Sequence, residues 1–192
     1  MSTGTPDKRD VILRTALHLF VERGFYGTPT SLISKEAGIA TGTLFWYFPT
    51  KEELIDTLYR EIKAEAGAAI RKGVDDEASV RDKLRRVCLN YTGWGIRNPA
   101  KRQFMEQFAH SPFVSQRAHN EGMSNFSFLS AIIEEGIRSG EIKKINPELI
   151  FYFLALSGSG VINLVRKTRD PGKKQILIDQ ALDLLWNGIS QI

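Results

Sequence analysis

Residues 28–53 constrain the fold of this chain most, because they encode two short helices joined by a tight turn. Gly38 follows the first helical pattern, Thr30 to Ala37, and glycine adopts the left-handed conformation that ends many helices at little cost. The second pattern runs from Thr41 to Tyr47, and Pro49 prevents its continuation because the residue before a proline disfavours the α region. Two short helices across a glycine-containing turn are typical of a helix-turn-helix, whose second helix enters the DNA major groove.

The second helix carries three aromatic side chains in succession, Phe45, Trp46 and Tyr47. Three successive positions span about 200° of a helix with about 3.6 residues per turn, so at least one ring must face outward. We expect Leu44 and Phe48 to pack inward and Trp46 to face outward. An outward ring beside hydroxyl groups and a lysine suits thymine methyl groups and the phosphate backbone. The alternative is that Trp46 is merely a solvated ring.

Residues 37–48, AGIATGTLFWYF, followed by residues 49–54, PTKEEL, resemble the DNA-binding signature of TetR-family transcriptional regulators. The similarity covers roughly residues 8–62, and beyond them it is one of architecture only. The family often has Ser where Ala40 stands, so Thr41 is the substitute cap of the second helix; position 41 itself is often Lys or Gln. The family also often has Thr-Thr where this chain has Thr28-Pro29, and we expect Thr28 to cap the first helix of the motif.

The resemblance and the helix geometry together assign the expected DNA contacts. The residues expected to contact phosphates are Thr30, Thr43, Tyr47 and Lys51, and those expected to face base edges are Ser31, Thr41, Gly42, Phe45 and Trp46. Lys51 lies in the first turn of a helix, where a positive charge opposes the helix dipole, and a phosphate contact would explain that position. The resemblance also implies a ligand-responsive transcriptional regulator, commonly a repressor, that binds a palindromic operator in double-stranded DNA as a dimer and is released by a small effector.

No stretch shows sustained period-two alternation with β-branched residues, so the chain is expected to be all-α. We expect an arm over residues 1–7, a first helix from Lys8 to Arg23 and another helix from Thr50. Capping residues before prolines, at 98–99, 111–112, 146–147 and 170–171, predict helices at 99–109, 112–138, 147–168 and 171–190. The helix at 112–138 either is continuous or breaks near Gly122. The expected domains are a three-helix helix-turn-helix DNA-binding domain at 1–50, a connecting helix and linker at 51–78, and a larger effector-binding and dimerisation bundle at 79–192.

The last two predicted helices are too apolar for the surface of a monomer. The helix at 147–168 is apolar nearly all round. The last helix carries two adjacent stripes, one of Ile178, Leu182, Leu185 and Ile189 and one of Ile176, Leu177, Ala181 and Leu184. Because so broad an apolar surface buries two sides of a helix, we expect a homodimer through the last two helices. Gly158 and Gly160 would allow close helix approach; the alternative is an ordinary core within one chain.

Aromatic residues are dense between Tyr91 and Phe153, beyond what the core of such a bundle requires. Pockets between bundle helices are lined in this way, with few polar groups. In TetR-like regulators this domain binds a small effector, so the resemblance implies an apolar or amphipathic ligand. The expected lining residues are Trp94, Phe104, Phe108 and Phe126, and the expected polar contacts come from His110, Asn120 or Asn125.

Charge and cysteine content restrict the cellular setting. The chain has 26 Lys and Arg against 22 Asp and Glu, but residues 1–63 carry eight of each, so DNA binding must depend on the local placement of a few donors. The single cysteine, Cys88, excludes an internal disulfide framework and suits a reducing, cytoplasmic setting. Leu149 to Val165 is uncharged over 17 residues, the lower limit for a membrane span, and we expect a buried helix there and no membrane partner.

An enzyme is not expected. The histidines and the cysteine show no metal-ligand spacing, and the chain has neither a glycine-rich phosphate loop nor a nucleophile elbow, so no catalytic residue, metal or cofactor is expected. Two non-enzymatic functions compete with the regulator. A helical ligand carrier would be indifferent to changes at Thr43, Tyr47 and Lys51, whereas an architectural DNA-binding protein would bind DNA equally well with every small molecule.

Overall fold

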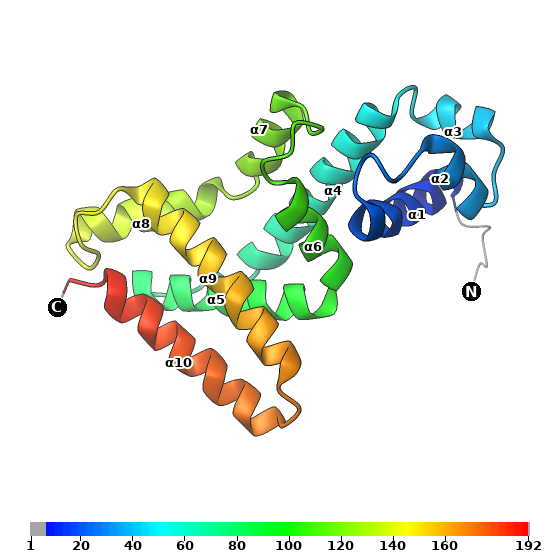
Figure 1. The fold of residues 1–192 in the computed structure, drawn as a ribbon. Helices are drawn as coiled ribbons and strands as arrows, with labels where there is room; N and C mark the ends of the chain where they lie inside the picture. Colours follow the sequence, from blue (N-terminus) through cyan, green and yellow to red (C-terminus); the bar gives the residue numbers. More distant parts are fainter. Residues whose placement is uncertain (1–6, 192) are drawn as a thin grey trace. The chain divides into compact units, whose positions relative to one another are not determined.

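The structure, a computed structural model, describes residues 7–191 and forms ten helices in that part of the chain (Figure 1). Apart from one isolated bridge between Ile142 and Ser190, the described residues form no strand pairing, which confirms the all-α class. The helices are α1 (Lys8–Arg23), α2 (Thr30–Glu36), α3 (Thr41–Tyr47), α4 (Lys51–Arg71), α5 (Val80–Arg97), α6 (Pro99–Phe108), α7 (Gln116–Ser124), α8 (Ser127–Ser139), α9 (Pro147–Lys167) and α10 (Pro171–Ile189).

The expected arm falls mostly outside the described residues, because the description begins at Asp7. Asp7 itself is the N-cap of α1, and its carboxylate accepts a hydrogen bond from the backbone N–H of Arg9 at 3.0 Å. The predicted bounds of α1 and α3 are confirmed, and those of α2, α6, α9 and α10 differ from the prediction by one residue at the C-terminal end.

The chain divides into two compact units. One unit holds the residues up to Ala64 together with Pro99–Gly122, and the other holds Glu65–Asn98 together with the residues from Met123 onward. This division differs from the expected boundaries at 50 and 78, because α6 and α7 group with the N-terminal helices instead of the C-terminal bundle.

Aromatic packing explains why α6 belongs to the first unit. The ring centroid of Phe20 on α1 lies 6.4 Å from that of Phe104 and 6.0 Å from that of Phe108, and all three side chains are buried. The side-chain amide of Gln107 also donates a hydrogen bond to the carbonyl of Val21 at 3.3 Å. The apolar stripe of α6 therefore covers α1.

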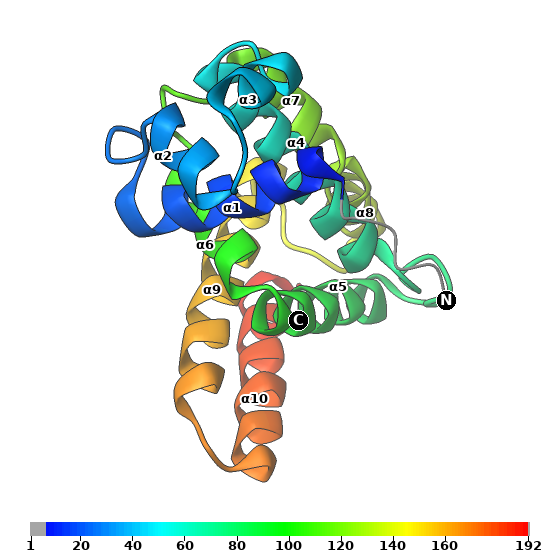
Figure 2. The same ribbon diagram turned by 90° about the vertical axis from the view of Figure 1, so that its right-hand side faces the viewer.

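The core of the first unit holds in place the two short helices, α2 and α3, which Figure 2 shows as ribbons. Ile12 and Phe20 of α1, Ile33 of α2 and Leu44 of α3 are all fully buried. Helix α2 packs against both α1 and α3. Because α2 and α3 are only seven residues each, this packing rather than helix propensity must stabilise them.

Thr28 has a different role from the predicted one. It is fully buried, and its hydroxyl lies 2.8 Å from the carbonyl of Gly24 and 3.1 Å from that of Leu19, at the end of α1. Pro29 directly precedes α2, and no side chain caps that helix. The prediction that Thr28 caps α2 is therefore wrong, because its hydroxyl binds carbonyl groups of α1.

The prediction that a helix begins at residue 112 is also wrong. The hydroxyl of Ser111 accepts a backbone hydrogen bond within a turn, at 3.2 Å, and α7 begins only after Ser115, whose hydroxyl accepts a backbone N–H at 3.1 Å. The helix breaks after Ser124, close to the break expected near Gly122. Gly122 serves close packing instead, since a Cβ atom there would lie 2.7 Å from the ring of Tyr59.

Asp56 and Arg60 lie four residues apart on α4 but do not pair with each other. The carboxylate of Asp56 accepts hydrogen bonds from the backbone N–H and the hydroxyl of Ser115, at 2.8 Å and 2.5 Å. Arg60 pairs with Glu121 at 3.4 Å. These contacts attach the start of α7 to α4 within the first unit, which the sequence spacing on α4 alone could not indicate.

The second unit contains α5, α8, α9 and α10, and the predicted caps of α9 and α10 are confirmed. Ser79 caps α5, Asn146 caps α9 and Asp170 caps α10, each by accepting backbone N–H groups of the first turn at distances between 2.8 Å and 3.3 Å. The buried side chains between these helices include Leu84 of α5 and Leu154 of α9. The caps and the core fix where α9 and α10 begin.

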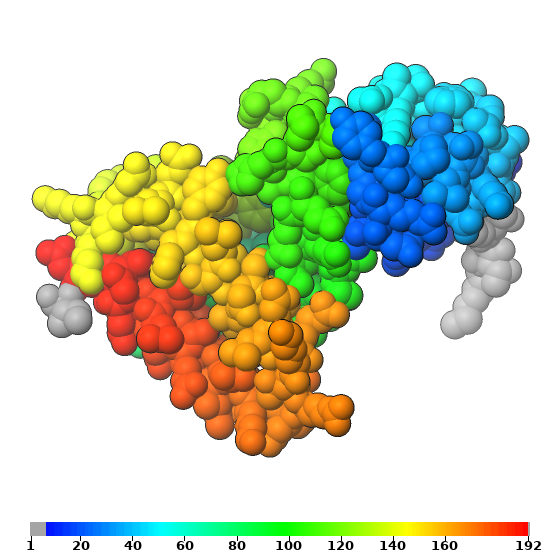
Figure 3. Space-filling model, in the orientation of Figure 1, coloured from blue at the N-terminus to red at the C-terminus, as the bar shows by residue number. Residues whose placement is uncertain are grey.

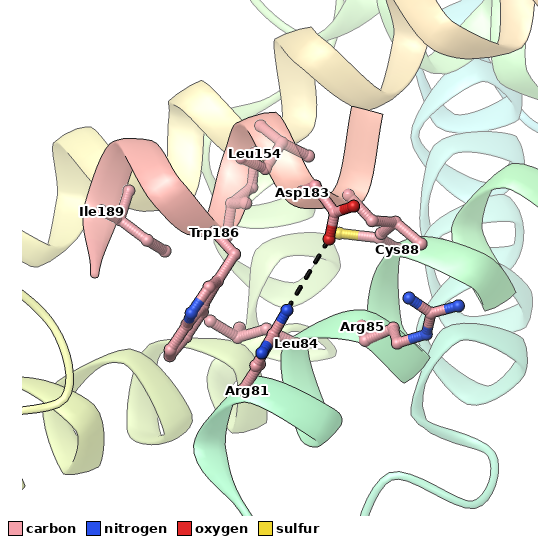
Figure 4. A pocket seen from close by; sticks show the side chains of 10 residues that line it. Arg81, Leu84, Arg85, Cys88, Leu154, Asp183, Trp186 and Ile189 are labelled. Carbon is pink, nitrogen blue, oxygen red and sulfur yellow. Dashed lines mark ion pairs between the residues drawn. The ribbon is translucent and has the colours of Figure 1, made fainter. Parts of the chain in front are cut away.

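Carboxylates of the same unit neutralise the basic face of α5. Arg81 lies 3.7 Å from Asp183, as Figure 4 shows, and Arg85 lies 2.9 Å from Asp179, so two arginines one turn apart meet two aspartates one turn apart on α10. The other basic residues of this face are also paired, Lys83 with Glu135 and Arg86 with Glu77. This face joins helices and has little free charge for attracting DNA.

Candidate nucleic-acid interface

Backbone hydrogen bonds around Gly38 fix the turn between α2 and α3. The N–H of Gly38 donates to the carbonyl of Lys35 at 3.1 Å, and the N–H of Ile39 donates to the carbonyl of Ser34 at 3.0 Å. These two bonds form the Schellman motif, which ends a helix with a left-handed residue, and Gly38 has φ of 66°. The turn therefore has the geometry that the glycine predicted.

Two buried side chains orient α3 and leave its aromatic surface outside. Leu44 is 0% exposed and Phe48 is 3% exposed, whereas Trp46 is 76% and Phe45 is 42% exposed. Tyr47 is half-buried, and its ring lies edge-on to that of Trp46 with 4.7 Å between centroids. The prediction that Leu44 and Phe48 pack inward and that Trp46 faces outward is confirmed.

The other predicted contact residues lie in the first turns of α2 and α3. Ser31, Thr41 and Gly42 are exposed, and Thr30 and Thr43 are half-buried. A Cβ atom at Gly42 would meet nothing within 4 Å, so the backbone there is open to a close partner. The first turns of the two helices thus offer hydroxyl groups and exposed backbone beside the aromatic rings.

A pair of hydroxyl groups joins α2 to α3. Oγ of Ser34 lies 3.0 Å from Oγ1 of Thr41, and it also donates to the carbonyl of Ser31 at 3.0 Å. Helix α3 begins after Ala40 without a side-chain cap, so the expectation that Thr41 caps α3 is wrong: its hydroxyl bonds to α2 instead. Ser34, which is 2% exposed, was not predicted to have a role, and its only sequence signal is a serine on the inner face of α2.

Lys51, a predicted phosphate contact, already has a partner inside the first unit. Its ammonium group donates a hydrogen bond to the carbonyl of Phe25 and lies 3.9 Å from the centroid of that ring, which stacks on Phe113 at 4.0 Å. Burial lowers the pKa of Lys51 below its ordinary value, against a smaller opposing effect of Glu52. Because an ammonium group has three N–H donors, two of them remain for another acceptor.

A second surface of the chain, on α9 and α10, is strongly apolar. On α9 the exposed large side chains are Leu149, Tyr152, Phe153, Leu156 and Leu164, and on α10 they are Ile176 and Leu184. The two helices lie side by side in Figures 1 and 2, and their atoms form one continuous surface in Figure 3. We call these residues the α9–α10 face. The opposite stripe of α10 is buried, so the predicted two-sided apolar character of that helix is confirmed.

Gly158 and Gly160 have different surroundings. A Cβ atom at Gly158 would lie 2.7 Å from the ring of Tyr91 on α5, and the hydroxyl of Tyr91 lies 2.8 Å from that of Ser159. A Cβ atom at Gly160 would meet nothing within 4 Å. The expectation that both glycines allow a second copy to approach is therefore wrong for Gly158, which packs inside the chain, and for Gly160 it stays a prediction.

Within the described residues, α9 is the one helix long and apolar enough to cross a membrane, with a mean hydropathy of 1.6 over a window that is 22% buried. The expectation of a buried helix is therefore wrong for a single chain. Only the side toward α5, α8 and α10 is covered, where Ile150, Leu154, Ile162 and Val165 lie.

A groove of about 520 Å³ lies in the second unit beside the beginnings of α8 and α9. Its apolar lining comes from Met123, Phe126, Pro147, Phe151 and Tyr152, and its polar lining from Ser127, Ser130, Glu134, Asn146 and Glu148. The lining includes two carboxylates and no lysine or arginine. The groove therefore combines an apolar surface with hydrogen-bonding groups and negative charge.

Of the four predicted effector residues, Phe126 lines this groove. Trp94 is 2% exposed, and its indole N–H donates to Glu65 at 3.2 Å. Phe104 and Phe108 pack against Phe20 in the first unit, so the four residues are divided between the two units. A single pocket lined by all four stays a prediction.

The proposed polar contacts to an effector are likewise divided. His110 and Asn120 are exposed residues of the first unit, and the side chain of Asn120 accepts a hydrogen bond from Gln116 at 2.9 Å. Asn125 belongs to the second unit, where it approaches Gly67: a Cβ atom at Gly67 would lie 2.8 Å from that of Asn125. None of the three lines the groove beside α8 and α9.

A small cavity of about 30 Å³ lies between α5, α9 and α10, next to Cys88 (Figure 4). Such a volume has room for a water molecule and not for an organic effector. Burial raises the pKa of the Cys88 thiol to about 12, so the thiol stays protonated and is a poor nucleophile. This cavity is a feature of helix packing.

Comparison with known proteins points to one family. Residues 12–58 match the family model for bacterial regulatory proteins, tetR family. The crystal structure of a putative TetR-family transcription regulator from Shewanella sp. PV-4 is 30% identical and has a TM-score of 0.87, covering 96% of this chain and 99% of that chain. The fatty acid metabolism regulator protein of Bacillus subtilis is 27% identical over 135 residues, 69% of this chain and 70% of that protein. The structure of FadR from Bacillus subtilis in complex with stearoyl-CoA shares the fold, with a TM-score of 0.75 at 22% identity, covering 94% of this chain and 98% of that chain.

Proposed function

The chain belongs to the TetR family of bacterial regulatory proteins, and we propose that it represses transcription by binding a two-fold symmetric operator as a homodimer. Family membership makes it a ligand-responsive, DNA-binding transcription regulator. In the proposed cycle the dimer holds two α3 helices on the operator, and an effector in the second unit releases it. The sign of regulation and the release are part of the proposal.

The observation that supports DNA binding most is the orientation of α3. Burial of Leu44 and Phe48 leaves Trp46 and Phe45 outside, next to exposed Thr41. An exposed pair of aromatic rings beside hydroxyl groups fits the major groove, which offers thymine methyl groups and hydrogen-bonding base edges together. We assign α3 as the recognition helix, with Ser31, Thr41, Gly42, Phe45 and Trp46 toward base edges.

The phosphate contacts are proposed for Thr30, Thr43, Tyr47 and Lys51. Hydroxyl and ammonium groups donate to phosphate oxygens, and such contacts fix the register of a protein on the duplex without selecting sequence. Lys51 keeps its bond to the carbonyl of Phe25 and uses its remaining N–H donors for the phosphate. The stacked rings of Phe25 and Phe113 then position the ammonium group.

The second copy is proposed to bind the α9–α10 face. Soluble monomers rarely expose contiguous apolar patches of more than a few hundred Å², and this face has seven exposed large apolar side chains on two neighbouring helices. Gly160, with open space around it, allows a helix of the second copy to approach closely. A two-fold dimer would present two recognition helices to half-sites about 34–36 Å apart, or a multiple of that distance.

The effector is proposed to be amphipathic, with its apolar part in the groove beside α8 and α9. FadR from Bacillus subtilis binds stearoyl-CoA, a long-chain ligand with a highly charged head group. In this chain Glu134 and Glu148 line the groove and would repel phosphate groups. We therefore propose a head group that is neutral or positively charged, held by Ser130 and Asn146 and favoured by the two carboxylates.

Selection of bound sequences from random duplex DNA tests the DNA-binding proposal. The purified full-length protein at near-physiological salt should enrich a two-fold symmetric consensus. Mass spectrometry of the denatured extract checks that the protein is free of bound small molecules. If such protein enriches no sequence, the regulator proposal is contradicted. A ligand carrier would then be favoured.

Release from a selected duplex tests the effector proposal. A long-chain alkyl amine and the matched alcohol, below micelle-forming concentrations, should release the protein, and the matched acyl-CoA should release it less effectively. Ser130→Trp should fill the groove and abolish the response while leaving DNA affinity unchanged; Ser139→Trp, at the far end of α8, is the control. If acyl-CoA releases the protein and Ser130→Trp does not change that release, the effector binds outside the groove. DNA binding that responds to no ligand would favour an architectural DNA-binding protein.

A further inference from the structure

The pair of hydroxyl groups between α2 and α3 determines which hydrogen bonds Thr41 has left for a partner. A hydroxyl group has one hydrogen to donate and two lone pairs that accept. Oγ of Ser34 lies within hydrogen-bonding distance of the Ser31 carbonyl and of Oγ1 of Thr41, at 3.0 Å in both cases. A carbonyl oxygen only accepts, so the single hydrogen of Ser34 must go to Ser31 if both bonds form.

The direction of the second bond follows from the first. Since Ser34 has no second hydrogen, Thr41 must donate its own hydrogen to Ser34. Ser34 is 2% exposed, so its oxygen has no access to water and Thr41 is the partner that can donate to it. Thr41 is exposed and is the first residue of α3. The oxygen of Thr41 therefore reaches the surface as an acceptor only, with no hydrogen left to donate.

We propose that Thr41 is a specificity-determining residue that accepts a hydrogen bond from an exocyclic amino group, and so selects adenine or cytosine on the strand it contacts. This inference rests on the proposed function, in which α3 enters the major groove. Major-groove donors are limited to the amino groups of adenine and cytosine, whereas guanine presents acceptors and thymine an acceptor and a methyl group. Phosphate oxygens are also acceptors, so Thr41 belongs among the base contacts and not among the phosphate contacts.

Ser34 is then a positioning residue, since it acts on the operator only through the hydrogen of Thr41. In Ser34→Ala the bond between the two helices is lost and the hydrogen of Thr41 becomes free to donate. Guanine or thymine at the contacted position should then be accepted as well. The preference for adenine or cytosine should fall by about threefold to tenfold, the contribution of one neutral hydrogen bond.

The test is sequence selection with the full-length protein and four variants. Thr41→Val replaces the hydroxyl by a methyl group. The operator position at which this variant loses the base preference is the one that residue 41 contacts. The wild type should show adenine or cytosine at that position, and Ser34→Ala should relax the preference there alone. Thr41→Ser should keep the preference, which excludes a contact made only by the threonine methyl group. Ser139→Ala, which removes a hydroxyl that likewise bonds to the carbonyl three residues before it but lies on α8, is the matched control and should leave the consensus unchanged.

The outcomes separate this inference from the proposed function. If the wild type enriches a two-fold symmetric consensus but Ser34→Ala shows the same base preference at the position of residue 41, the hydrogen-bond assignment is overturned and the regulator proposal stands. A wild-type preference for guanine or thymine at that position would also overturn the hydrogen-bond assignment and leave the regulator proposal standing. If the wild type enriches no sequence, the proposed function and this inference both fail. Circular dichroism of Ser34→Ala establishes that the variant is folded.

Discussion

The chain exposes large apolar side chains on two surfaces, and the groups beside those side chains differ. On α3, Trp46 and Phe45 lie close in sequence to the hydroxyl groups of Thr41 and Thr43. On the α9–α10 face, Leu156 follows exposed Tyr152 and Phe153 by one helical turn. A partner for the first surface must offer hydrogen-bonding groups as well as apolar ones, whereas a partner for the second needs only an apolar surface. DNA meets the first requirement, and a second copy of the chain meets the second.

The two surfaces also differ in extent. Among residues 7–191, seven of the eleven exposed large apolar side chains lie on α9 and α10, and two lie on α3. Non-polar burial can therefore drive association at the α9–α10 face by itself. At α3 non-polar burial can only add to polar contacts. Substitutions on α3 should therefore alter the preferred DNA sequence more than they alter dimer formation. Variants on the two surfaces test this distinction.

The largest effect is expected for Leu156→Glu, which places a charge on the α9–α10 face. Leu156 is 74% exposed in the single chain, so the fold should tolerate the change, whereas a dimer interface should not. The protein should become monomeric by light scattering. Its affinity for the selected operator should fall by about 100-fold or more, because two linked recognition helices bind with avidity that one lacks.

Ala155→Glu is the control for that experiment. Ala155 is also exposed, but it lies about 100° further round the helix from Leu156. This variant should remain dimeric and bind the operator normally. If Leu156→Glu stays dimeric too, the second copy does not bind the α9–α10 face.

Trp46→Ala should have the next largest effect, and it should act on sequence preference. The loss of a ring facing the bases should weaken binding to the best sequence by about 10-fold to 100-fold, in line with about 1–3 kcal/mol for a base contact. Repeating the selection with this variant should give an altered consensus, while light scattering should show an unchanged dimer. Tyr26→Ala, which removes an exposed ring outside α3, is the control; an unchanged consensus for Trp46→Ala would show that the base-facing assignment is wrong.

The two glycines of α9 provide a matched pair on the two sides of one helix. Gly158→Ala should destabilise the folded chain by about 1–3 kcal/mol, because the new methyl group overlaps the ring of Tyr91. Gly160→Ala should leave the fold intact or stabilise it by up to about 1 kcal/mol through helix propensity. Urea unfolding of both variants in the Leu156→Glu background measures the effect on the single chain. Equal stability of the two variants would contradict the different surroundings of these glycines.

The smallest effects are expected for the phosphate contacts. Tyr47→Phe and Lys51→Ala should each weaken binding to all sequences by about 2-fold to 10-fold, without changing the consensus. Lys51→Ala should also reduce the slope of log affinity against log salt concentration by about 1, since one counterion fewer is released. Lys173→Ala on α10 removes the same charge far along the chain and should leave the slope unchanged. If the salt slope is the same for Lys51→Ala and the wild type, Lys51 does not contact a phosphate and binds Phe25 alone.

The sequence predicted local features of this molecule well because local chemistry determines them. Gly38 at the turn, the inward orientation of Leu44, and the capping by Asn146 and Asp170 each depend on residues within a few positions of one another. The exposure of Trp46 follows from helix geometry in the same way. The prediction of a helix-turn-helix and the predicted first residues of the last two helices are therefore confirmed.

Features that depend on distant partners could not be predicted in this way. An apolar stripe on α6 shows that the helix buries one side, but it does not show that Phe104 and Phe108 would bury it against Phe20. The hydroxyl of Thr28 could have capped α2 and instead bonds to α1. Ser34 gave no signal beyond being a serine on the inner face of α2, because its role exists only once α3 has packed beside α2.

The mass of the complex between the protein and a selected duplex tests the central claim most directly, namely that one apolar surface binds DNA and the other binds a second copy. Native mass spectrometry should be performed with a duplex that carries both half-sites and with one that carries a single half-site. The account predicts two chains on the first duplex and much weaker binding to the second. One chain bound to either duplex with equal affinity would contradict it, because the α9–α10 face would then have no part in operator binding.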